Sequence, residues 1–186
     1  MLAAHDPLPR RPQRIAVAGP SGAGKSTLAR RLGALLDLPY TELDGLYHGP
    51  GWVPRPSFAA EVDALTSQDR WVTEWQYDDA RPLLTARADL FVWVDLPYPL
   101  ALARVVRRTV RRRLRDEELW NGNREAPLHT FLTDREHVVR ASISTRHLYD
   151  ERVPAVAAER PDLPVVRLRS ARQVDRWLAQ VVRPLA

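Results

Sequence analysis

The sequence predicts an α/β domain in which helices cover both faces of a parallel β-sheet. Short apolar runs alternate with segments of helical periodicity between residues 14 and 182. A glycine-rich turn joins the first apolar run to the first helical segment. The chain has 186 residues, which is enough for one domain with a sizeable core.

Five apolar runs have the length and the flanking residues of buried strands. The first run, RIAVA, ends at Gly19, and the fourth is closed by Pro97. The expected strands cover residues 14–18, 39–44, 70–75, 89–97 and 163–170.

Helical segments separate these runs. Leu28, Leu32, Leu35 and Leu36 follow helical spacing after the glycine-rich turn, and Ser57 is placed to cap a second helix. The expected helices cover residues 26–38, 57–67, 99–119, 128–159 with a kink or an end at Pro154, and 171–182. Loops are expected at residues 45–56 and 120–127, and a flexible N-terminal tail at residues 1–13.

The composition is that of an ordinary globular protein, with 45% hydrophobic and 27% charged residues. Because the chain has no cysteine, disulfides and thiolate metal sites are excluded. No apolar run is long enough to span a membrane, and the N-terminus lacks the apolar core of a secretory signal, so a cytoplasmic location is expected. The net charge of +5 and the pI of about 10.2 favour anionic partners such as nucleotides, phosphorylated metabolites or nucleic acid, or they reflect only a bias toward arginine.

The most specific motif is GPSGAGKST at residues 19–27, which fits the pattern G-x-x-x-x-G-K-[ST]. A predicted strand precedes the motif and a predicted helix follows it, which is the context in which this pattern wraps phosphates. Lys25 would reach the β- and γ-phosphates of a nucleotide, and the Ser26 hydroxyl would bind Mg²⁺. The predicted nucleotide-binding residues are Gly19, Pro20, Ser21, Gly22, Ala23, Gly24, Lys25, Ser26 and Thr27.

Lys25 is the only lysine among the 28 basic residues of the chain, and the other 27 are arginine. A narrow nest of backbone N–H groups has room for a compact ammonium on a thin stem, whereas a planar guanidinium is wider. This physical difference explains why lysine is kept at a position where arginine cannot replace it.

With these residues, the chain resembles the P-loop kinases related to adenylate kinase, and among them the group labelled adenylate-kinase-like or DNA-topology-modulation proteins. The resemblance covers residues 14–182 and is carried by GPSGAGKST, ELDGLYHGPGW, DLFVWVDLP, ELWNGNRE and VVRLRS. It implies a three-layer P-loop NTPase fold whose five-stranded parallel sheet has the order 2-3-1-4-5. It also implies a small helical lid at residues 114–128, and ATP and Mg²⁺ as cofactors.

Asp44 ends the second predicted strand, where a carboxylate could accept or orient the proton of an attacking hydroxyl. Aromatic residues near it suggest a ring-bearing or apolar-faced acceptor, because aromatic surfaces stack on rings and on cations. The alternative is a loop carboxylate surrounded by packed aromatic side chains. The predicted acceptor pocket consists of Asp44, Tyr47, His48, Trp52, Trp75 and Tyr77.

In adenylate kinases, an aspartate at the end of the third strand holds Mg²⁺ through water, and Glu74 stands at the matching place here. Asp95, at the end of the fourth predicted strand, is the rival carboxylate for the metal. The DGFPR-type continuation of adenylate kinases is replaced by EWQYDDAR, which argues against nucleoside-monophosphate acceptors.

Four arginines share one face of the helix expected over residues 99–119: Arg104, Arg108, Arg111 and Arg115. Related kinases use lid arginines to clamp the transferring phosphoryl group, because a guanidinium stabilises spread-out negative charge. The predicted clamp residues are Arg108 and Arg111 with Arg124 of the lid, and Arg146 is a weaker candidate. The alternative is a solvated basic face.

In the turn after the fifth strand, Ser170 and Ala171 are implied by the resemblance to contact the adenine ring. The predicted function is that of an ATP-dependent kinase acting on a hydroxyl or phosphate of a nucleoside, nucleotide or metabolite. The alternative is a nucleic-acid-associated ATP-binding protein or a polynucleotide kinase. A GTPase is excluded, because the guanine-reading Asn-Lys-x-Asp motif needs a second lysine.

Overall fold

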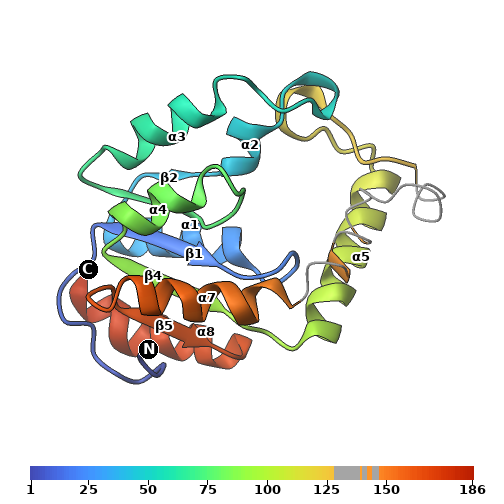
Figure 1. Ribbon diagram of the computed structural model, residues 1–186. Helices are drawn as coiled ribbons and strands as arrows, with labels where there is room; N and C mark the ends of the chain where they lie inside the picture. Colours follow the sequence, from blue (N-terminus) through green and yellow to red (C-terminus); the bar gives the residue numbers. More distant parts are fainter. Residues whose placement is uncertain (128–138, 140–141, 144–146) are drawn as a thin grey trace.

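The computed structural model describes residues 1–127, 139, 142–143 and 147–186. Its centre is a sheet of five parallel strands in the order β2-β3-β1-β4-β5 (Figure 1). The predicted α/β class and the predicted strand order are both confirmed. The strands are β1 (Arg14–Ala18), β2 (Tyr40–Thr41), β3 (Trp71–Glu74), β4 (Leu90–Val94) and β5 (Val165–Leu168).

Helices lie on both faces of this sheet, as the alternating pattern predicts (Figure 1). The α-helices are α1 (Lys25–Leu36), α2 (Leu43–Tyr47), α3 (Phe58–Thr66), α4 (Arg81–Arg87), α5 (Tyr98–Leu114), α7 (Leu148–Glu159) and α8 (Ala171–Trp177). Shorter helical turns are η1 (Pro50–Trp52), η2 (Trp120–Gly122), η4 (Leu178–Val182) and η5 (Arg183–Leu185).

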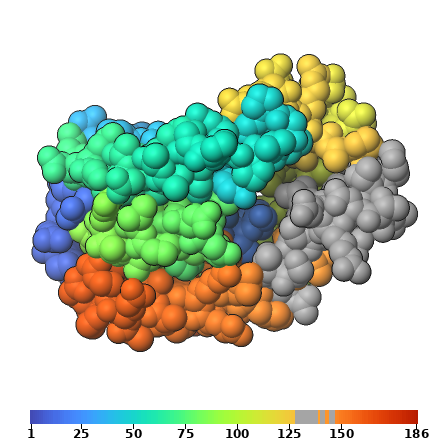
Figure 2. Space-filling model, turned by 45° about the horizontal axis from the view of Figure 1, so that its top comes forward, coloured from blue at the N-terminus to red at the C-terminus, as the bar shows by residue number. Residues whose placement is uncertain are grey.

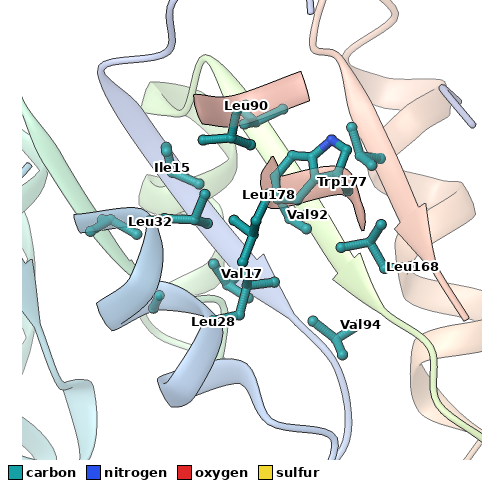
Figure 3. Close-up of a cluster of buried hydrophobic side chains, with 14 of the residues drawn as sticks. Ile15, Val17, Leu28, Leu32, Leu90, Val92, Val94, Leu168, Trp177 and Leu178 are labelled. Carbon is teal, nitrogen blue, oxygen red and sulfur yellow. The ribbon is translucent and has the colours of Figure 1, made fainter. Parts of the chain in front are cut away.

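One face of the sheet is covered by α1 and α8, whose apolar side chains form a buried cluster with β1 and β4 (Figure 3). Leu28 and Leu32 lie one helical turn apart on α1 and contribute to this cluster together with Ile15 and Val17. Each fully buried leucine of this kind contributes about 1.5–3 kcal/mol through removal of apolar surface from water.

The opposite face is covered by α3, α4 and α7. Because side chains alternate along a strand, Ala16 and Ala18 of β1 belong to this second cluster, between the residues that face α1. Apolar residues on both faces explain why the strands appear in the sequence as continuous apolar runs.

All five strands run in the same direction, so their carboxyl ends lie at one edge of the sheet. Val17 of β1 is in register with Glu74 of β3, and Ala18 of β1 is in register with Trp93 of β4. The glycine-rich turn after β1 therefore lies beside the residues that follow β3 and β4. Ligands of open α/β sheets bind at this edge.

Three element predictions differ from the structure. The second strand has only Tyr40–Thr41, and Asp44 lies instead in the first turn of α2. Helix α4, at residues Arg81–Arg87, is not predicted from the sequence, because seven residues are too few to show a helical period and the second of them is Pro82. Helix α5 ends at Leu114, before the predicted end at residue 119.

The N-terminal segment, predicted as a flexible tail, contacts the domain. The N–H of Leu2 donates to the carbonyl of Val165 at 2.7 Å, beside the outer strand β5. Leu8 joins the cluster that includes α1 and α8. The flexibility of this segment stays a prediction. Among the described residues, no helix is long and apolar enough to cross a membrane.

Candidate functional site

The turn between β1 and α1 has a backbone that only glycine adopts readily. Gly19, Gly22 and Gly24 have φ angles of 147°, 79° and 100°, a region in which L side chains are strained. A Cβ on Gly22 would also lie 2.1 Å from the carbonyl oxygen of Ala101. The predicted strand–turn–helix context of the GPSGAGKST motif is thus present, and α5 packs tightly against the turn.

Lys25 and Ser26 are the first two residues of α1, directly after Gly24. The first N–H groups of a helix have no partner within the helix and carry partial positive charge, which favours anions. The Lys25 ammonium donates to the carbonyl of Pro20 at 3.3 Å, so it lies over the turn. These groups together form a cationic cradle at the carboxyl edge of the sheet.

Helix α5 brings arginines toward this cradle. The position of a Cβ on Gly24 would be 3.9 Å from the guanidinium of Arg104, so Arg104 is beside the cradle. The Arg108 guanidinium is largely buried, its Nε has no hydrogen-bond partner among the described residues, and burial lowers its pKa. The sequence predicts that both lie on one helix face, but the predicted clamp residues do not include Arg104.

The other two predicted clamp arginines are paired with carboxylates of the same segment. Arg111 lies 3.8 Å from Glu117, and Arg124 forms an ion pair with Asp116. Both would have to leave these partners to reach a phosphate. Arg146 lies outside the described residues.

Asp44 is held by two donors from the segment after β3. The amide of Gln76 and the hydroxyl of Tyr77 each donate to its Oδ1 at 2.6 Å. Within the described residues, Oδ2 accepts no hydrogen bond and is available to a ligand. Burial, and next the charge of Asp44, raise the pKa of Tyr77, so its phenol stays protonated.

Aromatic rings extend from Tyr77 outward. Tyr47 stacks on Tyr77 with ring centroids 3.9 Å apart, and His48 Nε2 lies 3.2 Å from the Tyr77 hydroxyl. His48 in turn contacts the rings of Trp52 and Trp120. Burial lowers the pKa of His48, so its imidazole is neutral at pH 7.

Trp75 does not belong to this surface. Only 4% of the residue is exposed, its indole donates to the Thr85 hydroxyl at 3.0 Å, and its ring packs against Phe91. The prediction that Trp75 lines an acceptor pocket is therefore wrong, because the side chain points into the core between β3 and α4. Trp120, which is not among the predicted pocket residues, contacts His48 instead.

The segment after α5, predicted as the lid, is attached to the loop that carries Trp52. Asn123 accepts from the N–H of Trp52 at 3.0 Å and donates to the carbonyl of Gly49 at 2.8 Å. The Asn121 amide donates to the carbonyl of Gly45 at 3.3 Å. Figure 1 shows these two segments side by side, far from each other in the sequence.

Figure 2 shows the resulting hollow. Its rim includes the cyan segment around α2, the yellow segment after α5 and the orange start of α7, and blue atoms from the first part of the chain lie at its bottom. The cradle and the Asp44 network thus belong to one edge of the molecule.

The two carboxylates proposed for the metal differ in their surroundings. Glu74 is 1% exposed and accepts from the Tyr40 hydroxyl at 2.6 Å and the N–H of Leu43 at 3.3 Å. Asp95 instead accepts from the Arg167 guanidinium at 2.8 Å and 2.7 Å. The charge of Asp95 is therefore compensated, whereas no cation lies within ion-pair distance of Glu74 in the described part of the chain.

These observations fit Mg²⁺ on the Glu74 side. A buried carboxylate without a cationic partner and the Ser26 hydroxyl are hard oxygen ligands of the kind Mg²⁺ takes. Among the described residues, no cluster of three or more potential His, Cys, Asp or Glu ligands occurs. A kinase-type magnesium site needs no such cluster, because nucleotide phosphates and water supply the other ligands.

The turn after β5 caps α8. The Ser170 hydroxyl accepts from the N–H of Gln173 at 3.1 Å, and the Gln173 side chain accepts from the N–H of Arg169 at 2.7 Å. Ala171 is exposed as the first residue of α8. A cavity of about 410 Å³ lies between this turn and the cradle, and it is lined by Pro20, Trp93, Asp95, Leu96, Pro97, Tyr98, His147, Tyr149, Asp150 and Arg169.

Solved structures share this arrangement of elements. The fold is similar to that of shikimate kinase from Acinetobacter baumannii in complex with shikimate, with a TM-score of 0.54, 20% identity, and coverage of 90% of this chain and 89% of that chain. It is similar to a gluconokinase from Sinorhizobium meliloti, with a TM-score of 0.52, 20% identity, and coverage of 95% and 97%. Shikimate kinase from Bacteroides thetaiotaomicron gives a TM-score of 0.51 at 14% identity, with coverage of 91% and 96%.

The chain thus shares the fold of these solved kinases, and its sheet has the strand order that the resemblance implies. No protein-family model matches the chain, and no curated protein matches it in sequence. Membership of the narrower DNA-topology-modulation group stays a prediction.

Proposed function

We propose that this protein is an ATP-dependent kinase that transfers the γ-phosphoryl group of ATP to a hydroxyl of a small-molecule acceptor. One observation carries the proposal: the cationic cradle and the carboxylate of Asp44, held with one oxygen available, lie at the same edge of the sheet. A cradle without a nearby carboxylate would suit nucleotide binding alone. A cradle together with a carboxylate suits transfer of a phosphoryl group from a bound nucleotide to a bound acceptor.

On the donor side, the turn of residues 19–24 and the start of α1 would wrap the phosphates, with Lys25 on the β- and γ-phosphates. Ser26 and, through water, Glu74 would hold Mg²⁺, which neutralises charge that develops on the phosphates. The cavity between Pro20 and Arg169 would receive the purine base, against the backbone of Ser170 and Ala171. Thr27 stands in the first turn of α1, where a hydroxyl can reach a phosphate oxygen.

On the acceptor side, Asp44 Oδ2 would accept a hydrogen bond from the attacking hydroxyl and align it with the γ-phosphorus. In the reaction, the bond from the acceptor oxygen to phosphorus forms while the bond from phosphorus to the β–γ bridging oxygen breaks. The hydroxyl proton leaves to Asp44 and then to water, and ADP is released. Gln76 and Tyr77 act as positioning residues, because they hold the other carboxylate oxygen.

Arginines of α5 would stabilise the transferring group. Arg104 is beside the cradle, and Arg108 offers a largely buried guanidinium whose Nε has no hydrogen-bond partner among the described residues. A guanidinium in a site of low polarity interacts strongly with the charge spread over three phosphoryl oxygens. Arg111 and Arg124 would join them only after their ion pairs with Glu117 and Asp116 open.

The acceptor pocket would be formed by Tyr47, His48, Trp52 and Tyr77 around Asp44. Its stacked rings favour an acceptor with an apolar ring face and hydroxyl groups at its edge. Kinases of shikimate and gluconate share the fold, and their names point to hydroxylated small acids as acceptors of those proteins. We infer a hydroxylated metabolite as the acceptor class here.

The test is a coupled assay of ADP release with the full chain, Mg²⁺ and ATP, across nucleosides, sugars, hydroxy acids and nucleoside monophosphates. Acceptor-stimulated ADP release, with a phosphate monoester of the same acceptor detected by ³¹P NMR, is the expected result. If calorimetry shows that ATP binds but no acceptor in the panel raises ADP release above the rate with water, the proposal of a small-molecule kinase is wrong.

A further inference from the structure

A second cationic cavity lies at the opposite edge of the sheet, at the amino ends of β1, β4 and β5. Its volume is about 190 Å³, which corresponds to roughly six water molecules at about 30 Å³ each. All its residues belong to the described part of the chain. Its charged lining residues are Arg10, Arg14, Arg87, Asp89, Arg160 and Asp162.

The charges of this cavity are unbalanced. Four arginines and two aspartates line it, which leaves a formal excess of two positive charges. Both aspartates are occupied. Asp89 accepts from the N–H groups of Gln13 at 3.1 Å and Arg14 at 2.9 Å, and the two oxygens of Asp162 accept from Arg160 at 2.9 Å and 2.7 Å.

Two of the arginines, Arg87 and Arg160, are held in place by contacts with other residues of the protein. The Arg160 guanidinium also donates to the carbonyls of Thr85 and Ala86, both at 2.8 Å. Arg87 donates to the carbonyl of Asp63 at 3.0 Å and pairs with its carboxylate at 2.8 Å. Because these side chains are already ordered by protein contacts, a ligand would not have to order them on binding.

The other two arginines, Arg10 and Arg14, have side-chain N–H groups that form no hydrogen bond with the described residues. Arg14 Nε is buried, has no hydrogen-bond partner in the described residues, and lies 3.9 Å from Asp89, beyond hydrogen-bond distance. Arg10 is exposed and forms no hydrogen bond or ion pair with any described residue. A buried N–H without an acceptor is costly, so an acceptor oxygen supplied by an anion would be favoured there.

We propose that this cavity binds a phosphate group, with Arg10 and Arg14 as its main donors and Arg87 and Arg160 as rigid cationic walls. The site is separate from the nucleotide cradle, because Arg14 and Gly19 stand at opposite ends of β1, about 16 Å apart at 3.3 Å per residue. Both sites can therefore be occupied at once. The phosphate can be free or part of a small phosphorylated metabolite, since the four guanidiniums recognise the same oxyanion in either case.

The experiment uses the full chain with its cradle saturated by Mg²⁺ and a non-hydrolysable ATP analogue. Inorganic phosphate is titrated by calorimetry in one arm, and a sugar phosphate monoester in a second arm. We expect one saturable site that weakens with rising salt, as exposed charge interactions do. A tighter fit of the monoester identifies a metabolite site, and equal or better binding of inorganic phosphate identifies a site for the free ion; both support the proposal.

Two variants and one control locate the binding. Arg14→Gln should weaken phosphate binding by about tenfold and Arg10→Ala by about fivefold, as expected for loss of charge-assisted hydrogen bonds. Because Arg10 is exposed, we expect Arg10→Ala to fold normally. This variant can therefore still locate the phosphate site if Arg14→Gln fails to fold. Arg31→Gln removes an exposed arginine that pairs with Asp175 on the α1 side, and it should leave binding unchanged.

Three results would overturn the proposal. The first is the absence of saturable phosphate binding, and the second is equal weakening by all three variants, which would mean non-specific attraction. The third comes from an arm with a single-stranded oligonucleotide: binding there that Arg10→Ala weakens, without any phosphate binding, would replace the proposed site with a nucleic-acid surface.

Discussion

The proposed donor side and the proposed acceptor side of the hollow are built in different ways. The donor cradle is one continuous stretch, residues 19–27, whose shape comes from backbone angles at three glycines. The acceptor side combines side chains from three separate segments, around residues 44–52, 76–77 and 120–124. The cradle therefore depends on local conformation, and the acceptor side depends on long-range contacts.

This difference predicts which functions can be separated by mutation. Changes in the cradle should impair every reaction of ATP, because in the proposed function the cradle would hold the common substrate. Changes around Asp44 should impair transfer to the acceptor and leave ATP binding intact.

Lys25→Ala should have the largest effect, a loss of about 10³-fold in kcat/KM, because the ammonium would contact the β- and γ-phosphates, between which the bond breaks. ADP release by the coupled assay measures this loss, and circular dichroism checks that the fold persists. Lys25→Arg should fail similarly, because the guanidinium does not fit the nest. Full activity of Lys25→Arg would contradict the explanation offered for the single lysine.

Asp44→Asn should lower kcat by about 10²-fold, within the range of a lost general base, while the KM for ATP changes less than about twofold. Initial rates at varied ATP and fixed acceptor separate these two effects. If the KM for ATP rose as much as kcat fell, Asp44 would belong to the donor side, and the division between the two regions would not hold.

Tyr77→Phe should lower kcat by about tenfold, since one hydrogen bond to a charged group is lost. Gln76 still holds Asp44, so the loss is smaller than for Asp44→Asn. The matched change Tyr47→Phe keeps the ring stack and removes a hydroxyl that does not bond to Asp44, and it should cost less. Equal losses from both changes would show that the phenol–carboxylate bond has no special role.

His48 should produce the smallest effect, a dependence of stability on pH. In the folded protein, burial lowers the pKa of His48 below the ordinary value of 6.5. The imidazole of the unfolded chain therefore binds a proton at a higher pH than the imidazole of the folded chain. The resulting contribution to stability is complete above about pH 6.5 and falls as the pH drops from 6.5 toward the folded-state pKa.

Thermal unfolding of His48→Gln at pH 7.5 and pH 5.5 tests this sign. The variant should lose less stability on acidification than the native protein, by a difference in Tm on the order of 1–3 °C. His5→Gln changes a largely exposed histidine and serves as the control. An unchanged slope in His48→Gln would mean that the imidazole is not desolvated as described.

The comparison also explains which sequence predictions hold and which do not. The glycine-rich turn, the presence of five strands and the order of the sheet agree with the structure, although the second strand is shorter than predicted. Each of these features depends on local patterns or on the resemblance carried by local motifs. Trp75 is mispredicted as a pocket residue, since nothing local distinguishes a tryptophan that faces the core from one that faces a ligand.

The sequence by itself determined the glycine-rich turn and the alternation of strands and helices, because glycine conformations and apolar periodicity act over a few residues. Only the tertiary structure decided that Tyr77 and Gln76 hold Asp44, that Asn123 attaches the predicted lid segment to the Trp52 loop, and that Arg14 and Arg160 line one cavity at the amino edge of the sheet. These contacts join residues far apart in the chain, and side-chain direction and partner choice there follow from packing of the whole domain.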